Sequence, residues 1–394
     1  MKWIHGLACA VVLCMQAAVW GDAGVFTGTG QDLRQISTHS VRLVSIDVKV
    51  VLGRGPFLFD GTVPGMDEAR YDCTFVLQNL TDNACDVEVG FPVDSEFAQV
   101  PKDPKDPLED WVLRCGFIAK DTDDTYHVKF QDVDPDKVAD AYSAIFTWKM
   151  AFKPKETRTL TVQYHIPISM TVDSPDKRGA DGVVAAGRKH RWMVMLDSCM
   201  AEIAGYTTET GSTWSGNVEK ATFTVITDPF EKYLNYRGST EENVSELPAD
   251  QQKTVRDFFP VEHEWWYRAV TPAGWKAVDD GIQWQYKNYK PRDPLTITYY
   301  QMEYPTLASD VDPWVDAILR TIPDKSKQPG ELAIVKQILL ATYGQAPTDA
   351  DAKAFCEDQI WYAPKKDFSA SKLGKDQRAV VAALDHRINA LAKR

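Results

Sequence analysis

The chain has 394 residues, of which 44% are hydrophobic and 25% charged, a composition that fits a folded protein and excludes a disordered chain. Because one ordinary domain has about 100–200 residues, two or three domains are expected. The 44 Lys and Arg residues against 56 Asp and Glu residues give a net charge of −12, which argues against binding to a nucleic-acid backbone.

A secretory signal peptide is predicted at the N-terminus, over residues 1–23. Lys2 precedes an apolar stretch over residues 7–20, which is short for a membrane span but fits the apolar region of a signal peptide. Small residues follow, so cleavage is expected after Gly21 or after Ala23. We therefore expect a secreted or periplasmic protein that does not span the membrane after cleavage. An uncleaved anchor, the alternative, would need a longer apolar run.

The cysteines after this segment are odd in number, so at least one thiol stays unpaired even in an oxidising compartment. Cys73 and Cys85 flank a short turn. In the hairpin that this turn predicts, they are four residues out of register at about 3.4 Å per residue, too far apart for a disulfide. Buried thiols, or a bond from Cys73 to Cys115, remain open. The full set is Cys73, Cys85, Cys115, Cys199 and Cys356, and it matches no metal or redox motif.

Between about residues 37 and 305, apolar and polar residues alternate with a period of two, as in strands with one buried face. The alternation is clearest on both sides of two short polar turns, at residues 80–83 and 153–156, and predicts two hairpins. Many short strands separated by Gly, Pro and Asp favour antiparallel β-sandwiches over βαβ units. The predicted strands cover residues 41–52, 71–77, 85–91, 146–152, 160–166, 192–196, 221–227, 282–288 and 295–300.

A polar, glycine-containing stretch over residues 173–189 divides this region. We therefore predict two β-sandwich subdomains, over residues 24–172 and 190–305. A short helix is expected within the second subdomain, at Pro248–Phe259.

The apolar period then becomes helical, and a helical domain is predicted over residues 306–394. The fold class is therefore mainly β with a helical C-terminal module, an α+β multidomain protein. Four helices are expected. The first begins at Asp312 and Pro313, and the second ends at Gly344. A short third helix begins with a capping box of Thr348 and Asp351, and the last has an apolar face of Val381, Leu384, Ile388 and Leu391.

Nucleophile motifs do not fit. The stretch Gly211–Gly216 has Thr213 where the G-x-S-x-G motif requires its first glycine, so it is interpreted as a turn. Cys199 could form a thiolate pair with His165 or His190, but His165 shares the solvent-facing parity of its strand, which favours a surface histidine.

Metal motifs are also incomplete, and no metal or other cofactor is expected. His263-Glu264 lacks a second histidine at zinc spacing. An acidic stretch from Asp132 to Asp140 is spaced like a calcium loop, but Lys137 stands where the turn glycine belongs. We interpret it as a solvated loop, and Asp121, Asp123 and Asp124 as a solvated turn.

Aromatic residues are concentrated between residues 265 and 304. Their alternation favours a sandwich core, although aromatic faces also bind sugar rings and peptides. Trp266 and Arg268 have the opposite parity to Trp265 and Tyr267, and an exposed Trp266 would be the better contact. The candidate ligand-binding residues are therefore Trp265, Trp266, Tyr267 and Arg268.

A characteristic set of residues ends the chain: Ala341, Gly344, Phe355, Trp361, Tyr362, Pro364, Asp367, Phe368 and Leu373. In this set the segment resembles the YARHG domain of exported bacterial proteins. Thr342 and Tyr343 replace the Arg and His of that family, so any role of those two residues is lost here. We interpret Trp361, Tyr362 and Pro364 as packing residues.

The β region also resembles an uncharacterised domain that often accompanies YARHG, through VLQNLTDNACDVEVGFPV and FTWKMAFKPKETRTLTVQYHIPIS. Both resemblances imply an exported bacterial protein and imply no reaction. The sequence therefore predicts a non-catalytic cell-envelope protein that binds an unknown ligand, such as a glycan or a peptide. The alternatives are an envelope-polymer hydrolase, which would need converging carboxylates, and a purely structural component.

Overall fold

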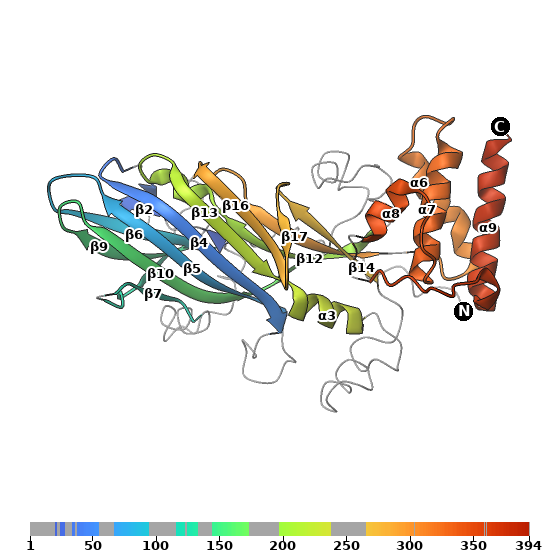
Figure 1. The fold of residues 1–394 in the computed structure, drawn as a ribbon, viewed down its shortest axis with the longest axis horizontal. Helices are drawn as coiled ribbons and strands as arrows, with labels where there is room; N and C mark the ends of the chain where they lie inside the picture. Colours follow the sequence, from blue (N-terminus) through green and yellow to red (C-terminus); the bar gives the residue numbers. More distant parts are fainter. Residues whose placement is uncertain are drawn as a thin grey trace, which may run out of the picture.

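A computed structural model describes residues 20–21, 24–27, 34–35, 38–54, 67–93, 116–122, 124–132, 144–172, 197–237, 265–302, 304–357, 359 and 361–393. It shows an elongated β body with a helical module at one end (Figure 1). This confirms the predicted fold class. The strand predicted at residues 192–196, the helix at Pro248–Phe259 and nearly all of the predicted signal peptide lie outside the described residues.

Sheet 1 has seven strands in the order β15-β16-β13-β4-β5-β10-β7. Most neighbours are antiparallel, but β13 runs parallel to β4. This pairing joins strands from both predicted β subdomains, so the polar stretch at residues 173–189 does not separate two cores. The strands are β4 (Val41–Arg54), β5 (Asp67–Asn79), β7 (Ile118–Lys120), β10 (Thr157–Pro167), β13 (Val218–Ile226), β15 (Lys276–Val278) and β16 (Gly281–Tyr289).

Sheets 2 and 3 have five strands each and pack on the same face of sheet 1. The ring of Phe91 in sheet 2 lies 5.1 Å from that of Tyr164, and Tyr206 in sheet 3 lies 6.3 Å from Tyr71. Sheet 2 contains β2 (Gly24–Thr27), β3 (Arg34–Gln35), β6 (Cys85–Val93), β8 (Lys129–Asp132) and β9 (Ala144–Phe152). Sheet 3 contains β1 (Trp20–Gly21), β11 (Ser169–Val172), β12 (Asp197–Thr207), β14 (Trp265–Thr271) and β17 (Leu295–Met302).

The two predicted hairpins are wrong, although their strands exist. β5 pairs with β4 and β10, whereas β6 pairs with β2 and β9. Each turn therefore carries the chain from one sheet to the facing one. In a hairpin and in a crossing between sheets, the apolar side chains of both strands face the core. The alternation of apolar and polar residues therefore cannot show which of the two connections is present. Cys73 and Cys356 are buried thiols and Cys85 is a half-buried thiol, while the side chains of Cys115 and Cys199 lie outside the described residues.

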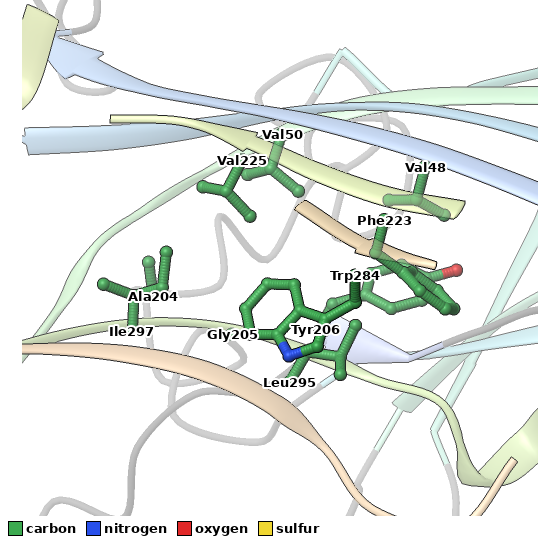
Figure 2. A pocket seen from close by; sticks show the side chains of 10 residues that line it. All are labelled: Val48, Val50, Ala204, Gly205, Tyr206, Phe223, Val225, Trp284, Leu295 and Ile297. Carbon is green, nitrogen blue, oxygen red and sulfur yellow. The ribbon is translucent and has the colours of Figure 1, made fainter. Parts of the chain in front are cut away.

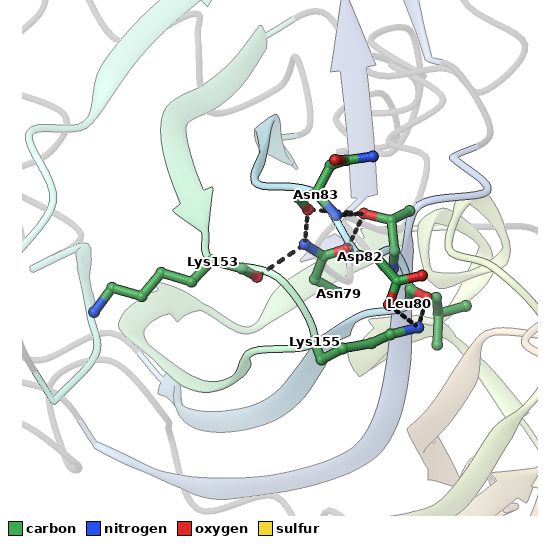
Figure 3. Close-up of polar contacts among 7 residues, drawn as sticks. Asn79, Leu80, Asp82, Asn83, Lys153 and Lys155 are labelled. Atoms are coloured by element: carbon green, nitrogen blue, oxygen red, sulfur yellow. Dashed lines mark hydrogen bonds and ion pairs between the residues drawn. The ribbon is translucent and has the colours of Figure 1, made fainter.

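The side chain of Asn79 connects the two turns, at residues 80–83 and 153–156, by hydrogen bonds (Figure 3). Its fully buried amide nitrogen donates to the carbonyl oxygens of Asn83 at 2.8 Å and Lys153 at 2.9 Å, one in each turn. The amide oxygen accepts from the backbone N–H and the hydroxyl of Thr81. Lys155 adds a bond from its Nζ to the carbonyl of Leu80 at 2.8 Å. One side chain therefore satisfies backbone groups in both of the turns that connect sheets 1 and 2.

We expect Asn79→Asp to lower the free energy of unfolding by about 2–4 kcal/mol, because it removes both donors and places a charge in a buried position. Urea unfolding followed by tryptophan fluorescence measures the change. Asn83→Asp is the matched control, since Asn83 contributes its backbone carbonyl and is exposed. Equal stability of the two variants would contradict the role given to Asn79.

The helical module consists of α6 (Val311–Arg320), α7 (Gln328–Thr342), α8 (Ala350–Glu357) and α9 (Lys375–Ala392) around a separate apolar core. Gly344 has a φ of +102° after α7, as its predicted role at the helix end requires. The cap of α8 differs from the prediction: Oδ1 of Asp349, and not Thr348, accepts the N–H groups of Asp351 and Ala352.

The aromatic pair of the C-terminal motif packs within the helical module. Trp361 is buried in the module core and meets Tyr362 edge to face at 6.2 Å. The N–H of Lys365 donates to the carbonyl of Gly344 at 2.8 Å, so the segment after Trp361 folds back over the end of α7. Phe355 packs against the same core, whereas Pro364 is exposed.

Candidate functional site

The predicted ligand-binding residues lie on β14, at the edge of sheet 3. Trp266 is 2% exposed and belongs to the core, so it does not provide the exposed contact that was considered for it. Its parity turns it towards the space between sheets 3 and 1. The core interpretation of the aromatic residues is confirmed for Trp284 and Tyr299, and Trp266, which was the exception to that interpretation, is buried as well. The side chains of Trp265 and Tyr267 lie outside the described residues.

Arg268 shares the parity of Trp266 and starts a polar row across sheet 3. It pairs with Tyr299 on β17, which pairs in turn with Glu202 on β12. Residues directly opposite each other project from the same face of a sheet. Tyr299 is fully buried and Glu202 is 4% exposed, so this face is the inner one.

The helix α3 (Asp228–Arg237) supplies the fourth member of this group. Oε1 of Glu231 accepts hydrogen bonds from Nη1 of Arg268 at 2.8 Å and from the hydroxyl of Tyr299 at 3.0 Å. The side chains of Glu231 and Arg268 are each 14% exposed. We call Glu202, Glu231, Arg268 and Tyr299 the Glu231 cluster.

The surroundings hold this cluster in place. The Arg268 guanidinium lies over the ring of Trp275, 5.7 Å from its centre, an arrangement that favours a cation. Phe230 and Leu234 anchor α3 in the core, and the Phe230 ring meets Tyr299 edge to face at 5.0 Å. Burial, followed by the charge of Glu231, raises the pKa of Tyr299 well above its ordinary value. Its hydroxyl therefore remains a hydrogen-bond donor at any physiological pH.

An apolar cavity of about 20 Å³ lies between sheets 1 and 3 (Figure 2). It shares the inner face of sheet 3 with the cluster, because Ile297 is two residues before Tyr299 and Ala204 is two residues after Glu202. Two residues of a strand span about 7 Å. Its lining residues carry no charged group and are Val48, Val50, Ala204, Gly205, Tyr206, Phe223, Val225, Trp284, Leu295 and Ile297.

His165, the histidine considered for a thiolate pair, lies on the outer face of sheet 1, as its parity predicted. Its Nδ1 is 3.2 Å from Oε2 of Glu68, whose other oxygen accepts from Nε of Arg70 at 2.5 Å. Burial tends to raise the pKa of Glu68, but the hydrogen bonds and charges of His165 and Arg70 lower it overall. The side chain of Cys199 lies outside the described residues, so no pairing with it is assigned.

The prediction of a solvated acidic turn is wrong for Asp121 and correct for Asp124, while Asp123 lies outside the described residues. The Asp121 side chain is fully buried, with Arg158 and Tyr126 as its partners, while Asp124 is exposed. Among the residues with described positions, no three His, Cys, Asp or Glu side chains are grouped to hold a metal ion. Within the same part of the chain, no helix is both long and apolar enough to cross a membrane.

Sequence reasoning found Arg268 but missed its partners. Glu231 lies in a short helix that was not predicted, and Tyr299 was assigned to the core for its aromatic ring alone. Glu202 lies on β12, which falls between the strands predicted at residues 192–196 and 221–227 and was not itself predicted. A charged residue at an inward parity, as at Arg268, is the one local signal that could have indicated a buried polar group.

Neither the known protein families nor the curated proteins contain a match to this chain. Among solved structures it is similar to a candidate nutrient binding protein from Legionella pneumophila, with 13% identity, coverage of 94% of this chain and 98% of the other, and a TM-score of 0.43. An M1 zinc metallopeptidase from Deinococcus radiodurans has 7% identity, coverage of 68% and 43%, and a TM-score of 0.26. This chain thus spans less than half of that peptidase. At such values the function has to be argued from the residues themselves.

Proposed function

We propose that this protein is a non-catalytic binding protein of the bacterial cell envelope, and that it holds a small ligand between sheets 1 and 3, beside Arg268. The signal-like N-terminus and the YARHG-like segment support the location. The observation that supports binding is the apolar cavity, with the Glu231 cluster at the next inward-facing residue pair of sheet 3. Small-molecule sites combine such an apolar lining with a few well-placed polar groups that orient the ligand.

The hydrolase alternative has less support from this geometry. Its two carboxylates would have to face a common open pocket, with room for a water molecule or a sugar ring between them. Glu231 is instead bound to Arg268 and Tyr299, and the cavity lining contains no carboxylate, imidazole or thiol. Binding therefore needs fewer rearrangements than hydrolysis.

Chemical-shift changes in the full mature chain, titrated with small apolar alcohols such as 1-butanol, test this proposal. We expect the largest changes at residues that line the cavity, such as Ala204 and Val225. Ala204→Val should weaken binding at least several-fold, because the added methyl groups occupy the cavity. Ala277→Val, on the exposed strand β15, is the matched control. Changes confined to the outer sheet faces, or no changes at all, would contradict binding between the sheets.

A further inference from the structure

We propose that the ligand of this site is a short apolar carboxylate, and that the Glu231 side chain occupies its carboxylate position in the free protein. This inference rests on the proposed function and names the ligand class. It starts from the double hydrogen bond at Oε1 of Glu231, because a guanidinium and a phenol that converge on one carboxylate oxygen form a carboxylate-binding site.

The two hydrogen-bond donors of this site, Arg268 and Tyr299, are held in place, whereas the Glu231 carboxylate that they bind can move. Arg268 and Tyr299 project from paired strands, with Trp275 below the guanidinium and Phe230 against the phenol ring. Glu231 reaches them from a helix through a side chain with three rotatable bonds, and 14% of that side chain is exposed. The carboxylate can therefore turn towards solvent without any movement of the strands.

The helix need not move either. Phe230 and Leu234 are 0% and 1% exposed and hold α3 on the core, so the exchange requires a new rotamer of Glu231 alone. An incoming carboxylate would then take over the bonds from Arg268 and Tyr299. Arg268 would still be paired with a single carboxylate, because that of the ligand takes the place of Glu231.

The other carboxylate of the cluster limits this exchange to one ligand. Glu202 lies on the same inner row, directly opposite Tyr299. A second added carboxylate would raise the negative charge near Glu202 in a region with little water, which is unfavourable. The ligand must therefore compete with Glu231 and cannot simply add to it.

The cavity sets the size of the apolar part. Its volume of about 20 Å³ exceeds the room that one water molecule needs only slightly. None of the four residues of the Glu231 cluster lines this cavity, so only the end of a short chain attached to a carboxylate at Arg268, about one methyl group, would enter it. Long acyl chains and sugar rings would require the two sheets to separate, so the proposed class is that of propionate and butyrate.

Titration of the full chain with sodium butyrate and with 1-butanol, each followed by chemical-shift changes, tests this inference. We expect butyrate to bind at least about ten-fold more tightly than 1-butanol, equivalent to about 1.4 kcal/mol. Glu231→Gln should increase the butyrate affinity about five-fold or more, because a neutral amide competes less well for Arg268. Glu357→Gln, on the exposed end of α8, is the matched control.

The outcomes separate this inference from the proposed function. Equal binding of butyrate and 1-butanol at the cavity would overturn the carboxylate assignment and leave binding between the sheets intact. An unchanged butyrate affinity in Glu231→Gln would overturn the competition with Glu231. Absence of binding by either probe would overturn the proposed function as well. Arg268→Gln supplies a second variant, which should reduce butyrate affinity to that of 1-butanol, with its folding checked by circular dichroism.

Discussion

Gly281→Ala is expected to lower the free energy of unfolding by about 3 kcal/mol or more, or to prevent the β body from folding. A Cβ atom at this position would lie 1.9 Å from the carbonyl oxygen of Val225 and 2.9 Å from its carbonyl carbon. These are backbone atoms of β13, the strand to which β16 is hydrogen-bonded opposite Ile226. They cannot move away without breaking the ladder between the two strands.

Urea unfolding followed by circular dichroism measures this effect. Gly53→Ala is the matched control, because Gly53 lies in β4 of the same sheet and a Cβ atom there would meet nothing within 4 Å. We expect the control to stay close to the stability of the parent protein. If both variants lose the same stability, the cause is the general effect of alanine in these strands and not the contact with Val225.

The second large effect is expected at the ion pair between Arg268 and Glu231. Both side chains are mostly buried, and Arg268→Met would leave the Glu231 carboxylate without its cation. A double-mutant cycle with Arg268→Met and Glu231→Gln should give a coupling energy of about 1–3 kcal/mol, measured by urea unfolding. The expected coupling energy is limited because the Glu231 side chain can turn towards solvent when Arg268 is replaced.

The pair between Arg42 and Glu219 provides the comparison. Its atoms are 2.6 Å apart, but the side chains are 28% and 60% exposed, so water and salt screen the interaction. The same cycle on this pair should give less than about 1 kcal/mol. A coupling energy between Arg268 and Glu231 that is no larger than this would show that the Glu231 cluster is not a stable unit, and would also weaken the proposed ligand site.

The two proposals make different demands on this cluster. Binding between the sheets needs only the cavity, whereas the carboxylate assignment needs Arg268 and Tyr299 to retain their geometry when Glu231 leaves. The core contacts of Phe230 support that geometry independently of Glu231. Stability measurements on Glu231→Gln and ligand titrations of the same variant therefore report on separate properties of the site.

Part of the candidate site followed from the sequence. The parity of Arg268 and Trp266 against Trp265 and Tyr267 was correctly derived from alternation, and Arg268 was identified as a candidate. The burial of Trp266 was not predicted, because parity separates the two faces of a strand without showing which face meets another sheet. For an edge strand such as β14, that choice depends on the position of sheet 1.

The sequence by itself determined much of the local structure of this protein, although not the helix α3 or the strand β12. Strands such as β5 and β10, with their buried parities, and the end of α7 at Gly344 follow from periodicity and from backbone preferences within a few residues. Only the tertiary structure decided which strands pair, because the turns at residues 80–83 and 153–156 fit a hairpin and a crossing equally well. The Glu231 cluster depends on the same long-range choice, since its four residues come from four segments that no local pattern connects.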